Sequence, residues 1–147
     1  MKVLLYQPDI AGNVGTIIRL CACLDLELDI IEPCGFPFDD KKFKRAGMDY
    51  IDCVKIHKFS SFHEFMAKNP GKRIVLLTTK ADESFSEFLF DANDVLMVGR
   101  ETAGVPDEIH NLVDKRIVIP MKNNMRCLNV AVSLAMVMGV AISNITK

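Results

Sequence analysis

The apolar residues of this chain gather in short runs rich in Val, Ile and Leu, and turn-forming residues follow each run. Short apolar runs bounded by turns are typical of strands that are buried on both faces of a sheet. The predicted strands cover residues 3–6, 28–31, 53–56, 74–77, 95–98 and 117–119. Because segments of helical periodicity separate these runs, the sequence predicts an α/β fold with a mostly parallel sheet flanked by helices.

Helices are predicted from apolar periodicity and from the residues that favour helix ends. They cover residues 16–24, 39–47, 60–68 and 128–142. The last of these segments is apolar on nearly every side, with small residues such as Ala135 and Gly139 among Val, Leu and Met. A helix of that kind is buried on several sides. A chain of 147 residues could hardly cover it alone, so we expect this helix to lie in a subunit interface.

Composition narrows the class of protein further. The length suits a single domain over residues 1–147, and the net charge of −1 gives no overall signature of a nucleic-acid binder. The five cysteines contain no CxxC pair and no His/Cys cluster is present, so we expect neither a disulfide framework nor a metal site. No apolar run reaches transmembrane length and no signal-peptide pattern is present, so we expect a cytoplasmic protein without membrane contact.

Candidate chemistry lies in three loops, because ligands of α/β folds bind at the carboxyl ends of parallel strands. The first loop, residues 7–15, leads to Arg19; the second, residues 99–106, reads GRETAGVP; the third, residues 120–129, reads PMKNNMRCLN. Glycine turns and free N–H groups at a helix start would suit an anion such as an RNA phosphate. The fingerprints of dinucleotide, P-loop and α/β-hydrolase sites are absent, which disfavours those functions.

Each loop carries a distinct pattern of residues. The patterns are Asn13, Gly15 and Arg19 in the first loop, Gly99, Glu101, Gly104 and Pro106 in the second, and Ile119, Pro120, Met121, Arg126, Leu128 and Asn129 in the third. In this order they resemble the three signature motifs of the SPOUT class of RNA methyltransferases. The stretches IIRLCA, LLTTK and DDKKFKRAGMDY are similar to the branch of that class that methylates the ribose of the tRNA wobble nucleotide, cytidine or uridine 34. The resemblance covers essentially the whole chain.

The resemblance implies a C-terminal trefoil knot, a homodimer whose active site is completed across the interface, and S-adenosylmethionine as the methyl donor. It also implies roles for individual residues. The cofactor-binding residues would be Leu77, Gly99, Glu101, Ile119, Met121, Cys127 and Leu128, and the catalytic residues would be Arg19, Asn13 and Asn129. Because a guanidinium is a poor base, we expect Arg19 to hold the target's phosphate and stabilise the forming alkoxide rather than to remove the proton.

A basic segment is expected to contact the tRNA backbone, since phosphate contacts position RNA. It comprises Lys41, Lys42, Lys44 and Arg45, and Arg126 is a further candidate for RNA contact. The alternatives are a solvated helix face for the basic segment and an ion pair with Glu101 for Arg126.

Some positions depart from the pattern of many relatives. Cys127 and Ala131 stand where a serine is common, and Arg100 and Ala103 replace the Pro and Arg often found in the second motif. These departures bear on the exact substrate more than on the reaction class. The competing hypotheses are a ribose methyltransferase for another tRNA or rRNA nucleotide and a non-catalytic RNA-binding module of the same fold. Retention of Arg19 and Glu101 with both asparagines disfavours the latter.

Overall fold

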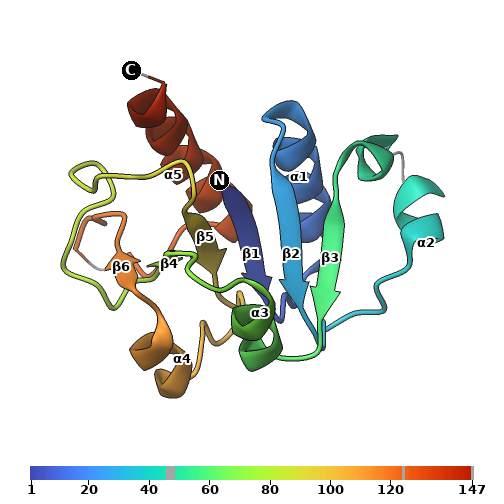
Figure 1. Ribbon diagram of the computed structural model, residues 1–147, viewed down its shortest axis with the longest axis horizontal. Coiled ribbons are helices and arrows are strands. Elements are labelled where there is room, and N and C mark those ends of the chain that lie inside the picture. Colours follow the sequence, from blue (N-terminus) through green and yellow to red (C-terminus); the bar gives the residue numbers. More distant parts are fainter. Residues whose placement is uncertain (46–48, 124, 147) are drawn as a thin grey trace.

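The computed structural model describes residues 1–45, 49–123 and 125–146, and its centre is a parallel sheet (Figure 1). The strands lie in the order β3-β2-β1-β5-β4-β6, and every pairing between neighbours is parallel. They are β1 (Lys2–Tyr6), β2 (Glu27–Ile31), β3 (Ile56–Phe59), β4 (Ile74–Leu77), β5 (Val95–Val98) and β6 (Lys115–Ile117). The predicted α/β class with a parallel sheet is confirmed.

Helices cover both faces of this sheet (Figure 1). One face carries α1 (Ala11–Cys23), α2 (Asp40–Arg45), the 3₁₀ helix η1 (Asp49–Cys53) and α5 (Val130–Ile145), and the other carries α3 (Phe62–Lys68) and α4 (Asp107–Leu112). The alternation of side chains along a strand divides the core accordingly. In β1, Val3 and Leu5 belong to the core under α1 and α5, whereas Leu4 and Tyr6 belong to the core under α3 and α4.

Two of the predicted strands are displaced. The strand predicted at residues 53–56 was wrong in position. The 3₁₀ helix η1 extends to Cys53, and the strand β3 begins only at Ile56. Val54, which directly follows η1, is buried without being in a strand, so its apolar character indicated burial rather than extended structure. The strand expected at 117–119 ends at Ile117, so Ile119 does not close it and lies beyond it as a buried residue.

The helix boundaries also differ from those predicted. The first helix begins at Ala11 rather than at residue 16, so Asn13 lies in its first turn instead of the preceding loop. The third begins after Ser61, whose hydroxyl accepts a hydrogen bond from the Glu64 N–H at 3.1 Å. Residues 46 and 47 of the predicted 39–47 helix lie outside the described residues, and α4 was not predicted. Among the described helices, none has the length and apolar character needed to cross a membrane.

A long connection, residues 78–94, joins β4 to β5 and passes along the outer edge of β6. The Phe85 N–H donates to the Val118 carbonyl at 3.0 Å, and the Val118 N–H donates to the Glu83 carbonyl at 2.9 Å. At its far end the buried carboxylate of Asp94 receives hydrogen bonds from the Arg73 Nε and Nη2, each at 2.7 Å. The connection is therefore fixed at both ends, and it covers a sheet edge that would otherwise expose backbone groups.

Candidate active site

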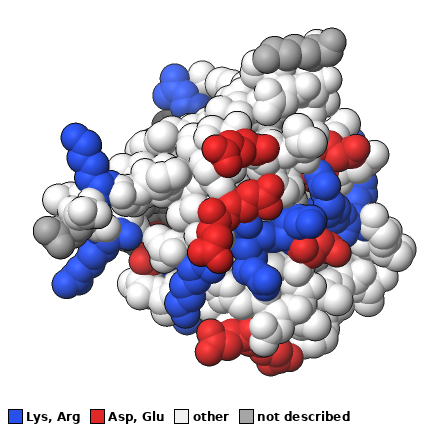
Figure 2. Space-filling view, turned by 90° about the vertical axis from the view of Figure 1, so that its left-hand side faces the viewer, with Lys and Arg blue, Asp and Glu red and all other residues white. Residues whose placement is uncertain are grey.

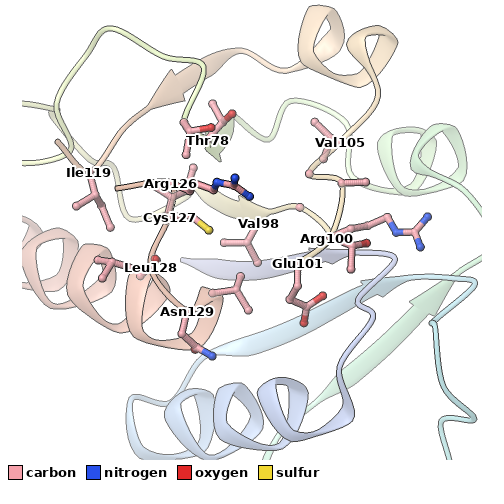
Figure 3. A pocket seen from close by; sticks show the side chains of 18 of the residues that line it. Thr78, Val98, Arg100, Glu101, Val105, Ile119, Arg126, Cys127, Leu128 and Asn129 are labelled. Carbon is pink, nitrogen blue, oxygen red and sulfur yellow. The ribbon is translucent and has the colours of Figure 1, made fainter. Parts of the chain in front are cut away.

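A cavity of about 480 Å³ opens where β4 and β5 end and where the chain leaves β6. Its walls come from residues 76–79, 98–105, 118–119 and 126–130, with Ile10, Asn13, Met121 and Ser133. Figure 3 shows side chains of the segment after β6 on one side of this cavity and those of the loop after β5 on the other. The volume lies within the range of small-molecule sites, about 300–1,000 Å³.

Most of the predicted site residues lie at this cavity. All the predicted cofactor-binding residues line it: Leu77, Gly99, Glu101, Ile119, Met121, Cys127 and Leu128. Asn13, Asn129 and Arg126 line it as well. The structure thus brings the three motifs together from opposite ends of the chain, while the individual roles of these residues stay predictions.

The loop after β5 is shaped by two glycines. The N–H and carbonyl of Arg100 and Gly104 exchange hydrogen bonds of 2.9 and 2.8 Å, which closes residues 100–104 into a narrow turn. Gly104 has a φ of +63°, a conformation that favours glycine. A Cβ on Gly99 would lie 2.7 Å from the Gly104 carbonyl carbon, so a side chain at Gly99 would force the turn apart.

Hydrogen bonds connect the three motifs beside the cavity. The Glu101 carboxylate accepts from the Asp9 N–H at 2.8 Å and from the Asn13 Nδ2 at 3.2 Å. The Asn13 Oδ1 in turn accepts from the Asn129 Nδ2 at 2.9 Å. Asn129 also caps α5, because its Oδ1 accepts from the N–H groups of Ala131 and Val132. Among the described residues Arg126 forms no ion pair with Glu101, so that alternative for Arg126 is not realised.

Asp9 holds the second motif through hydrogen bonds, and the sequence did not indicate this role. Its Oδ1 accepts from the Arg100 Nη2 at 2.7 Å, and its Oδ2 accepts from the Thr102 hydroxyl at 2.6 Å. Hydrogen bonds from Arg100, and then from Thr102, lower the pKa of Asp9 to about 2. Because its own N–H binds Glu101, Asp9 contacts three consecutive residues of the second motif and clamps the first loop to the second.

We expect Asp9→Asn to destabilise the protein at neutral pH more than at low pH. Folding lowers the pKa of Asp9 from 3.8 to about 2, so the stabilisation is fully present above the higher value and is lost as the pH falls through the lower one. Thermal unfolding of both proteins from about pH 7 down to about pH 2 measures this, with a difference in Tm that shrinks below about pH 4. A difference in Tm that stays constant with pH would contradict the conclusion that the ionised Asp9 carboxylate stabilises the fold.

Arg19 lies away from the cavity of its own chain. It is exposed on α1, and its Cζ lies 4.9 Å from the centre of the Tyr50 ring. Asn13 sits six residues, or about 1.7 turns, earlier on the same helix and faces the cavity, so the two side chains point in different directions. One chain alone therefore does not place Arg19 beside the predicted cofactor-binding residues.

The predicted RNA-binding segment is also separate from the cavity. It forms α2, at the β3 edge of the sheet in Figure 1, with Lys41 and Lys42 exposed. The side chains of Lys44 and Arg45 lie outside the described residues. The opposite end of the molecule, seen in Figure 2, mixes Lys and Arg with Asp and Glu rather than forming a uniform basic surface.

A cavity at the carboxyl edge of a parallel sheet, lined by apolar and hydrogen-bonding side chains, lies where α/β proteins usually bind a small-molecule ligand. Comparison with protein families makes the class specific. Residues 1–139 match the SpoU rRNA methylase family, and the chain belongs to that family.

Individual relatives are similar over nearly their whole length. The tRNA (cytidine(34)-2'-O)-methyltransferase of Beijerinckia indica subsp. indica is 52% identical over 143 residues, which are 96% of this chain and 89% of that protein. A solved structure described as giving insights into the 2-OH methylation of C/U34 on tRNA is 34% identical with a TM-score of 0.92, over 99% of this chain and 95% of that one.

A more distant structure shares the fold. The SpoU methyltransferase AviRb of Streptomyces viridochromogenes, solved in complex with the cofactor AdoMet, has a TM-score of 0.85 at 24% identity. The match covers 97% of this chain and 59% of AviRb. A methyltransferase of this fold therefore binds S-adenosylmethionine.

Proposed function

We propose that this protein is an S-adenosylmethionine-dependent tRNA 2′-O-methyltransferase that modifies the ribose of wobble nucleotide 34, a cytidine or a modified uridine. The observation that carries the proposal is the single cavity at which residues of all three motifs meet. The relative of 52% identity bears the name of this activity, and the family is one of RNA methylases. We further propose that residues 1–147 act as one domain.

The cavity fits S-adenosylmethionine in size and in chemistry. Val98, Ile119, Met121 and Leu128 provide apolar walls for an adenine and a thioether-like chain, and loop backbone lies between them. Two charged residues of the second motif also line the cavity. Asp9 binds the guanidinium of Arg100, and the other charged residue is Glu101, whose carboxylate is negative. A ligand with a positive sulfonium therefore meets an acidic group near the cavity.

The reaction requires a ribose 2′-hydroxyl to become a good enough nucleophile. S-adenosylmethionine supplies an electrophilic methyl group on a sulfonium. Arg19 donates hydrogen bonds to the target's phosphate and stabilises negative charge on the 2′-oxygen, while the phosphate or water accepts the proton. Asn13 and Asn129, whose amides join at the cavity, orient the ribose and hold the loops in place.

A homodimer explains how Arg19 can act although it lies outside the cavity of its own chain. The outer face of α5 is apolar, with Val132 50% exposed and Met136 41% exposed. This face continues to Leu128 at the cavity, which is 39% exposed. We infer that two copies pack through this surface and that Arg19 of one copy completes the cavity of its partner, with a tRNA bound across both chains.

The chain path supports a C-terminal knot. Residues 83–85 pair with Val118 on the outer side of β6, and the chain then returns to α5, which packs against α1. We propose that residues 119–123 and 125–129 pass through the loop made by residues 78–94, so that the cavity is enclosed by knotted segments.

The test is to incubate the purified protein with labelled S-adenosylmethionine and bulk tRNA, digest the RNA and map the label. We expect a 2′-O-methylated nucleotide at position 34. A tRNA with a single 2′-deoxynucleotide at that position is the matched control, and it should accept no label. Label on a base, on another nucleotide, on rRNA alone or on nothing would overturn the assignment.

A further inference from the structure

Arg19 is held by an aromatic ring from a different element. Tyr50 belongs to η1, which packs against α1, and its half-buried ring lies under the exposed guanidinium with 4.9 Å from Cζ to the ring centre. The ring also packs against the core that η1 helps to form, so it offers a fixed surface. The contact therefore packs the long side chain of Arg19 against a ring whose position is fixed by the core.

This contact leaves the functional groups of Arg19 accessible. Among the described residues Arg19 has an aromatic partner, Tyr50, and no carboxylate forms an ion pair with it. A guanidinium on an aromatic face keeps its N–H donors in the plane of the group, directed sideways, where they can bind a phosphate or an alkoxide. A carboxylate partner would occupy the same donors. An aromatic partner restricts the side chain without competing with substrate.

We propose that Tyr50 is a positioning residue for methyl transfer: its ring holds the Arg19 guanidinium in the orientation that the substrate requires. This inference rests on the proposed function. A long exposed arginine loses considerable rotamer entropy when it is fixed, and a side chain that is already stacked loses less of it on binding. Tyr50 therefore acts through Arg19 and contacts neither the cofactor nor the reacting atoms.

Replacement of the ring separates this role from simple packing. We expect Tyr50→Leu to lower kcat for methyl transfer about tenfold, within what a cation–π contact is worth, with cofactor affinity nearly unchanged. Tyr50→Phe keeps the ring and should retain most of the activity. Cofactor binding by calorimetry and the Tm of each variant show whether the fold and the cavity are intact.

A double-mutant cycle then tests whether Tyr50 works through Arg19. Arg19→Gln removes the charge and the cation–π contact but keeps an amide donor, so Tyr50→Leu should have less than about a twofold further effect in that background. A tenfold loss in both backgrounds, or full activity of Tyr50→Leu, would overturn the proposal while the proposed function stands. Absence of methyl transfer by the unaltered protein would overturn both.

Discussion

Arg19→Ala is expected to lower methyl transfer to tRNA by about a hundredfold or more while cofactor affinity stays within about twofold. The variant removes the group that we propose stabilises charge on the 2′-oxygen, yet Arg19 does not line the cavity of its own chain. Initial rates with labelled S-adenosylmethionine and calorimetric cofactor binding measure the two effects separately. Lys68→Ala, on α3 at the other face of the sheet, is a charge-matched control that should behave as the unaltered protein.

A parallel loss of cofactor binding in Arg19→Ala would refute the assigned role.

Mixing two different variants tests whether the active site is shared between subunits. Gly99→Val forces the 100–104 turn apart and should abolish cofactor binding, since even a Cβ there meets Gly104 at 2.7 Å.

If the sites are shared between subunits, an equal mixture of Arg19→Ala and Gly99→Val chains should recover activity. Half of the freely exchanging dimers are mixed and each has one complete site, so the expected rate is about a quarter of the unaltered value. If each chain used its own Arg19, no site would be complete and the mixture would stay inactive.

Met136→Asp is expected to convert the proposed dimer into monomers and to reduce methyl transfer at least about tenfold. A carboxylate in the centre of an apolar self-complementary interface would be desolvated without a partner, which costs several kcal/mol. Analytical ultracentrifugation gives the mass, and the methyl-transfer assay gives the activity. Leu89→Asp is the matched control, because Leu89 is an apolar residue 82% exposed on the 78–94 connection.

A monomer that keeps full activity would show that the cavity needs no second chain. A Met136→Asp dimer of unchanged affinity would show that the outer face of α5 is not the interface.

Much of the fold was predictable because parallel strands buried on both faces appear as apolar runs. The predictions for 74–77 and 95–98 agree with β4 and β5 to the residue. Where a residue is buried outside a strand, as Val54 is directly after η1, the same signal was misread as a strand. The start of α1 was predicted five residues late, because Ile10 before it provides no side-chain cap that would mark the helix start.

The candidate site was predictable where a motif is local and not where a contact joins distant residues. The glycines of the second motif sit together in the sequence and in the turn. Asp9 and Arg100 are 91 positions apart, and nothing in either segment indicates the ion pair between them. The position of Arg19 relative to the cavity and to Tyr50 depends on the rotation of α1 about its axis, and a helical pattern alone does not relate that rotation to the cavity loops or to η1.

Asn129 connects the cavity to α5 through its side-chain amide. Its amide donates to Asn13 at the edge of the cavity, and its carbonyl oxygen caps the helix proposed to form the dimer contact. Any ligand that shifts Asn129 also shifts the first turn of that helix. If α5 forms the dimer contact as proposed, ligand occupancy and subunit association share a thermodynamic linkage, and by reciprocity each strengthens or weakens the other by the same factor.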